Sequence, residues 1–136
     1  MAKPKTSPRS SSMSPSFDLQ VSYRLGAPVV YVRGELDHQT GPQLRAIIEE
    51  ESAGAPPAVI LDLTGLSYMD SGGLSLLFET INRLKGKSWL GLVGVTAPVS
   101  RLMEITGMVE QPGLRILPDL AAAAEALKGS EPPAAS

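Results

Sequence analysis

The chain has 136 residues, 43% of them hydrophobic and 19% charged, which suits a single domain with its own core and leaves no room for a second. It contains no cysteine and one histidine, so disulfides, zinc–thiolate sites and histidine clusters for metals are excluded. The formal net charge is −2, but residues 1–16 hold three basic side chains and no acidic one. The other nine basic and fourteen acidic side chains give residues 17–136 a charge of −5, which is unsuited to nucleic-acid binding.

Residues 1–16 and 129–136 are rich in serine, proline and alanine and show no periodicity. We therefore expect two disordered tails around a folded domain of residues 17–128. The N-terminal segment lacks the continuous apolar stretch of a secretory signal peptide. No apolar run of the chain approaches the roughly 20 residues that a membrane span needs. These features predict a cytoplasmic protein that makes no contact with a membrane.

The first half of the expected domain begins with two strands. Apolar and polar residues alternate over 17–23, and a second apolar run follows at 29–32, so we expect an antiparallel pair. Thr40 resembles a helix N-cap with Gln43 in the capping-box position, and the apolar spacing that follows predicts a first helix over residues 40–53.

The second half alternates strands and helices. The strands are expected at residues 59–63, 89–95 and 114–117, and the helices at 71–85, 98–107 and 120–127. Glu79 and Arg83 are spaced to pair on the exposed face of the middle helix, and Met103 and Met108 are expected in the core. This order predicts an α/β fold with a mixed β-sheet of about five strands and about four helices packed against it.

The segment Asp70-Ser71-Gly72-Gly73 places a hydroxyl beside a carboxylate, where the buried strand gives way to the second helix. Backbone N–H groups of a first helical turn lack intrahelical partners, and the helix dipole adds positive charge there, so a phosphate on Ser71 could be accommodated. Two alternatives remain open from the residues alone. Ser71 could be an ordinary N-cap, and Asp70 could serve either to cap the helix or to position Ser71.

The same four residues resemble the nucleophile segment of trypsin-like serine proteases. Such an enzyme needs a double β-barrel of about twice this length and a histidine base oriented by a buried aspartate. His38 is the only histidine, and it lies in a polar loop where we expect it to be solvated. Serine hydrolysis is therefore kept only as a remote alternative.

Three segments, at residues 34–40, 66–74 and 99–108, resemble the STAS-domain anti-sigma factor antagonists of bacteria in order and spacing, over roughly residues 17–128. The resemblance implies a single STAS domain that is not an enzyme. It implies that the protein binds an anti-sigma factor, which is a serine kinase of the histidine-kinase-like ATPase class, and so releases a sigma factor. Phosphorylation of Ser71 by that kinase would end binding, and a PP2C-type phosphatase would reverse it. No cofactor is implied, since ATP or ADP would be bound by the kinase.

The resemblance also implies which residues face the partner around the phosphorylated serine. These residues are Asp37, Thr40, Met69, Asp70, Ser71 and Gly72. The family usually has a second hydroxyl residue at the position of Gly72, and we expect the glycine to make the helix start more flexible. This departure favours an alternative in which the chain is a STAS scaffold or regulatory module without a phosphorylation cycle.

Overall fold

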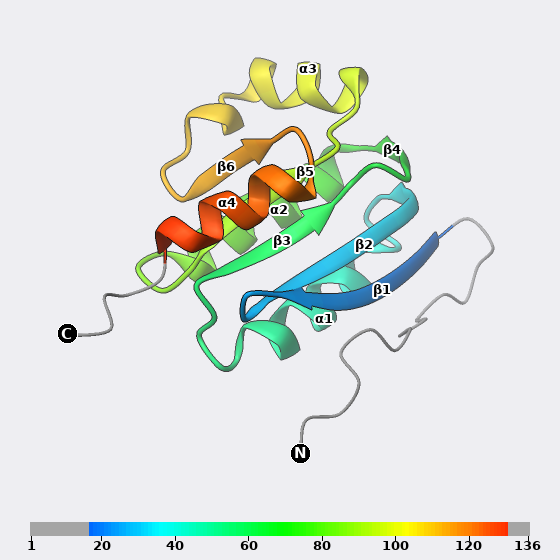
Figure 1. Cartoon of the computed structure of the whole chain (residues 1–136). Helices are drawn as coiled ribbons and strands as arrows, with labels where there is room; N and C mark the ends of the chain where they lie inside the picture. The colour runs from blue at the N-terminus through cyan, green and yellow to red at the C-terminus, as the bar shows by residue number, and fades with distance from the viewer. Residues whose placement is uncertain (1–16, 131–136) are drawn as a thin grey trace, which may run out of the picture.

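The computed structural model describes residues 17–130, in which six strands form one sheet with helices on both faces (Figure 1). The strands are β1 (Phe17–Arg24), β2 (Ala27–Leu36), β3 (Ala58–Asp62), β4 (Leu66–Met69), β5 (Trp89–Val93) and β6 (Leu114–Leu117). The helices are α1 (Gly41–Ser52), α2 (Ser71–Leu84), α3 (Ala97–Thr106) and α4 (Leu120–Ser130), with a short 3₁₀ helix, η1 (Met108–Glu110), after α3. The expected α/β fold with a mixed sheet is confirmed.

The sheet has the order β1-β2-β3-β5-β6, and β4 also pairs with β2. β1 is antiparallel to β2, and every other pairing is parallel. β3 pairs with residues 29–31 of β2, whereas β4 pairs with residues 34–36. Within the pairing of β2 with β4 the register shifts between Gly34 and Glu35, and Gly34 has a φ of 101°, which favours glycine. The end of β2 therefore pairs with a second strand in an irregular register.

β4 is the strand that the sequence did not predict, so the sheet has one strand more than the five expected. Its two ends, Leu66 and Met69, are buried, while Ser67 and Tyr68 between them are exposed. Four residues with this pattern carry no alternation, the signal by which a short strand is recognised. β4 leads directly into α2, so the strand fixes where that helix begins.

The main core lies between the sheet and one set of helices, α1, α2 and α3. Leu44 of α1, Leu77 of α2 and Met103 of α3 are fully buried there, and so is Met108. Burial of such a side chain stabilises the fold by about 1.5–3 kcal/mol relative to exposure. The two methionines are core residues, as expected from the sequence.

Within residues 17–130, α4 is the one helix that covers the opposite face of the sheet, and it lies in front of the sheet in Figure 1. Ala123 and Leu127 pack there against Ile60 and Trp89, forming a second, smaller apolar cluster. α4 continues to Ser130, three residues beyond its expected end. No helix in the part of the chain that the structure describes is long and apolar enough to cross a membrane. The predicted tail at residues 1–16 lies outside the described residues, as does 131–136.

Candidate functional site

Ser71 is the first residue of α2 and is exposed to solvent. The residue before it, Asp70, is the N-cap, with an extended backbone at φ −107° and ψ −169°. The Asp70 Oδ1 atom accepts hydrogen bonds from the N–H groups of Gly72 at 2.8 Å and Gly73 at 3.1 Å. Capping, one of two roles left open for each residue, therefore belongs to Asp70 and not to Ser71.

This cap changes what the helix start can offer to a phosphate on Ser71. Two N–H groups of the first turn already donate to Asp70, and its carboxylate lies beside the serine. The helix dipole still favours negative charge at this end. A phosphate on Ser71 would nevertheless lie beside the Asp70 carboxylate, which already accepts the hydrogen bonds of these two N–H groups.

A tight turn over residues 37–40 connects β2 to α1 and is held by the side chains of Asp37 and Thr40. Asp37 Oδ1 accepts from the N–H groups of Gln39 and Thr40, each at 3.0 Å. Thr40 Oγ1 accepts from the Asp37 N–H at 3.0 Å and donates to the Glu35 carbonyl at 2.8 Å. The Thr40 N–H, above all, lowers the pKa of the Asp37 carboxyl below its ordinary value, so Asp37 is ionised at neutral pH.

The capping box expected at the start of α1 is wrong. Thr40 occupies the N-cap position, but its side chain makes no capping hydrogen bond, because the hydroxyl serves the turn instead. Within the described residues, the side-chain Oε1 atom of Gln43 is buried and has no hydrogen-bond partner. Pro42 in the first turn removes one backbone donor, so α1 has less need of a cap.

Two glycines bring the start of α2 against the end of β2 and the turn. A Cβ atom on Gly73 would lie 2.8 Å from the Leu36 carbonyl oxygen, and one on Gly72 would lie 2.9 Å from the backbone N of His38. Both glycines therefore lie in tight packing, and the flexible helix start expected for Gly72 stays a prediction. This packing brings Asp37, Thr40, Asp70, Ser71 and Gly72 to one edge of the molecule.

Met69 lies below this edge. Only 7% of its surface is exposed, and it belongs to the main core. Tyr68, which the sequence analysis did not select, is 50% exposed and stands opposite Glu35 in the pairing of β4 with β2. An aromatic residue two positions before Asp70 was the available signal, and its importance depended on recognising β4.

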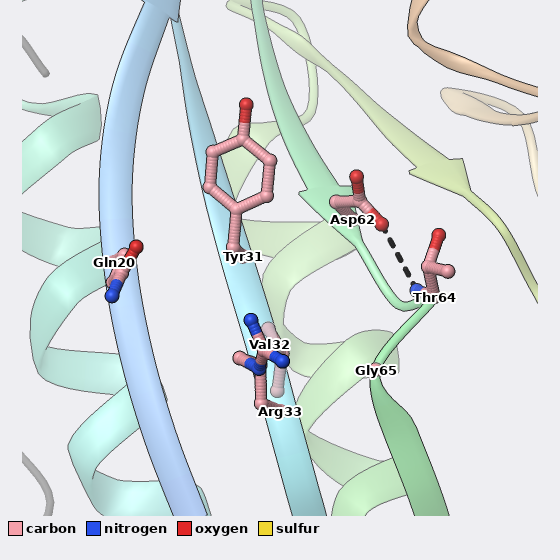
Figure 2. Close-up of a pocket in the computed structure, with 7 residues that line it drawn as sticks. All are labelled: Gln20, Tyr31, Val32, Arg33, Asp62, Thr64 and Gly65. Atoms are coloured by element: carbon pink, nitrogen blue, oxygen red, sulfur yellow. Dashed lines mark hydrogen bonds between the residues drawn. The ribbon is translucent and has the colours of Figure 1, made fainter.

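A second polar surface lies on the opposite face of the sheet, toward β1, where none of the described helices packs. A shallow depression on this face has a volume of about 260 Å³, and Figure 2 shows the residues that line it. Its lining residues are Gln20, Tyr31, Val32, Arg33, Asp62, Thr64 and Gly65. The Asp62 carboxylate accepts from the Thr64 N–H at 2.9 Å. The sheet separates this depression from Ser71. Among the described residues, no cluster of three or more histidine or acidic side chains could hold a metal ion.

Comparisons with known proteins agree with the resemblance of the three sequence segments. The STAS domain family matches residues 18–123. An anti-sigma-B factor antagonist of Listeria monocytogenes is 35% identical over 80 residues, which cover 58% of this chain and 70% of the relative. The crystal structure of an anti-sigma factor antagonist from Mycobacterium paratuberculosis has a TM-score of 0.75 at 30% identity, covering 85% of this chain and 97% of that chain. The Bacillus cell fate determinant SpoIIAA in its phosphorylated form has a TM-score of 0.60 at 25% identity, covering 81% and 98%.

Proposed function

This chain belongs to the STAS domain family, and from that membership we propose that it is an anti-sigma factor antagonist controlled by phosphorylation of Ser71. The unphosphorylated protein binds an anti-sigma factor that is a serine kinase, and the bound sigma factor is released. The observation that carries the proposal is the exposed Ser71 at the first position of α2, beside the capping carboxylate of Asp70. The phosphorylated form recorded for SpoIIAA supports it.

The geometry gives a physical reason why phosphorylation would end binding. A phosphate adds about −1.5 to −2 charges at neutral pH. The neighbouring Asp70 is held in place by its two hydrogen bonds to the helix, so it cannot turn away without uncapping α2. A partner surface shaped for a neutral hydroxyl would have to desolvate two adjacent anionic groups. The affinity falls while the core, which lies on the other side of the helix start, stays intact.

The residues around Ser71 contribute in different ways. Asp37 and Thr40 hold the turn, so that the exposed His38 and Gln39 reach the partner in a fixed conformation. Met69 supports the surface from below, and Tyr68 offers the partner a rigid aromatic contact of the kind that often dominates interface energetics. The protein itself needs no cofactor in this scheme, because the kinase binds the nucleotide and a PP2C-type phosphatase removes the phosphate.

The acceptor site is tested by incubating the protein with the anti-sigma factor kinase of its own genome and ATP, followed by intact-mass measurement. We expect one added phosphate on the wild type and none on Ser71→Ala, which should still bind the kinase. Ser75→Ala is the matched control, because Ser75 is exposed one turn further along α2. It should gain a phosphate normally. Incorporation that persists in Ser71→Ala would refute the site.

The charge mechanism is tested by comparing Ser71→Asp with Ser71→Asn, which have nearly the same shape and differ in charge. We expect Ser71→Asp to bind the kinase more weakly than Ser71→Asn, with melting temperatures of the two variants nearly equal. Equal affinities would show that charge is not what ends binding.

A scaffold or regulatory module without a phosphorylation cycle is the second candidate, and the polar depression of Figure 2 is the observation in its favour. It predicts a protein that stays unmodified with every anti-sigma factor kinase of its genome. Serine hydrolysis predicts labelling of Ser71 by a fluorophosphonate probe. In the structure the carboxylate next to Ser71 caps a helix and orients no histidine, so we expect no labelling.

A further inference from the structure

Gly72 is a residue of the site whose side-chain position is closed off by backbone. A Cβ atom placed there would lie 2.9 Å from the backbone N and 3.1 Å from the Cα of His38. Separations this short force a neighbour to move, and a backbone moves less readily than the end of a flexible side chain. α2 and the turn thus meet at Gly72 with no side chain between them.

Backbone conformation does not explain the glycine. Gly72 lies within α2 and does not belong to the glycines with positive φ. Inside a helix, glycine is less favourable than alanine, because it loses more conformational freedom on folding. The glycine at this position therefore weakens the helix locally, and what the fold gains is the close approach of the turn.

Neither neighbour of position 72 is free to yield to a side chain. On one side, Asp37 Oδ1 binds the N–H groups of Gln39 and Thr40 and keeps the turn closed. On the other side, Asp70 Oδ1 lies 3.1 Å from the same Cβ position and is held by its bonds to the first turn of α2. A side chain at position 72 must therefore open the turn or disturb the cap.

We propose that Gly72 is a specificity-determining residue: its missing side chain joins the exposed turn residues His38 and Gln39 to Ser71 in one surface that the anti-sigma factor kinase recognises as a unit. This inference rests on the proposed function, since it concerns how the partner recognises Ser71. A side chain at position 72 moves the turn relative to the acceptor serine. A partner that contacts the displaced turn then no longer reaches Ser71 in the correct position.

The first test needs no partner. It compares Gly72→Ala and Gly72→Ser with Gly54→Ala and Gly54→Ser, because a Cβ on Gly54 meets nothing within 4 Å. Backbone amide chemical shifts of each variant are measured against the wild type. We expect shifts to change over residues 37–41 in both Gly72 variants and to stay unchanged there in both Gly54 variants. Unchanged shifts over 37–41 in Gly72→Ser would overturn the packing argument.

The second test measures affinity for the anti-sigma factor kinase and the rate of phosphate incorporation at Ser71. For Gly72→Ser we expect Kd to rise about tenfold or more and the rate to fall by a similar factor. The Gly54 variants should equal the wild type. Melting temperatures establish that each variant is folded, and Gly72→Ala, with the smaller side chain, takes the place of Gly72→Ser if the latter unfolds.

The outcomes separate this inference from the function on which it rests. Wild-type affinity and rate in a folded Gly72 variant whose turn amides have shifted would overturn the specificity role and leave the proposed function standing. Wild-type protein that neither binds the kinase nor gains a phosphate would overturn the proposed function, and this inference with it. The two failures are distinguishable, because failure of the proposed function is already seen with the wild-type protein.

Discussion

The two helix starts at the site carry similar polar residues but use them in opposite ways. At α2, Asp70 turns its carboxylate onto the first helical turn and caps it. At α1, Thr40 turns its hydroxyl back onto the preceding turn and leaves the helix without a side-chain cap. One residue fixes a helix, and the other fixes the loop before a helix. The comparison shows that a polar residue at a helix boundary can bond either to the helix or to the loop before it.

The two helix starts should differ most in how much stability they lose when a glycine in each is replaced by alanine. A Cβ on Gly73 would lie 2.8 Å from both the Leu36 carbonyl oxygen and Met69 Cγ, whereas one on Gly41 meets Leu76 Cδ2 at 3.9 Å, an ordinary contact. We expect Gly73→Ala to lower the free energy of unfolding by about 1–3 kcal/mol. Gly41→Ala should leave it unchanged or slightly raised. Urea denaturation measures both, and equal losses would contradict the packing difference.

Truncating Asp70 and Thr40 to alanine tests whether each side chain stabilises its helix or the preceding turn. Asp70→Ala should cost about 0.5–2 kcal/mol of stability and expose the amides of Gly72 and Gly73 to hydrogen exchange. Thr40→Ala should speed exchange at the Asp37 amide, which donates to its hydroxyl, and leave the amides of α1 protected. Faster exchange in the first turn of α1 would mean that Thr40 caps the helix after all.

The turn before α1 should show its own dependence on pH. The Thr40 N–H holds the pKa of Asp37 below its ordinary value, so the folded state binds a proton less readily than the unfolded chain. The stabilisation by Asp37 is therefore complete above the ordinary aspartate pKa and is lost as pH falls through the lowered one. The amide shifts of Gln39 and Thr40 should titrate with that lowered midpoint. In Asp37→Asn this titration should vanish.

The smallest effect is expected from the ion pairs that join the two helices beyond their starts. Arg45 of α1 contacts Glu79 of α2 at 2.7 Å, and Arg83 contacts Glu79 at 3.4 Å and Glu49 at 3.2 Å. All four side chains are 40–46% exposed, so solvent screens them. Glu79→Gln should lower the melting temperature slightly at low salt and less at high salt. An equal loss at both salt concentrations would point to packing instead of charge.

Elements with a strong period were predictable from the sequence. The apolar spacing of α2 and the alternation of β1 placed both elements, and the expected pair of Glu79 with Arg83 is confirmed. β4 was not predicted, because four residues are too few to show a periodic pattern. It is a strand because it pairs with β2, about thirty residues earlier. A strand specified by its partner leaves little trace in its own sequence.

The candidate site was predicted as a set of residues and not as a geometry. The sequence placed a carboxylate beside Ser71 but could not decide which of the two caps the helix. It assigned Thr40 to α1, because the capping box counts spacing and not the competing acceptors in a turn. It could not place Gly72 against His38, because propensity describes a residue alone, whereas this contact depends on a segment more than thirty residues away.

The pairing of β4 with β2 also determines when Ser71 and the turn of residues 37–40 come together during folding. Ser71 and the turn of residues 37–40 are distant in the chain and meet only once β4 has added to the end of β2 and α2 has packed on the sheet. Parallel pairings of this kind form slowly, because a long loop must close before they contribute. An unfolded or newly synthesised chain carries the serine without the surface. Under the proposed function, a kinase that contacts both segments would phosphorylate the folded protein and not the unfolded chain.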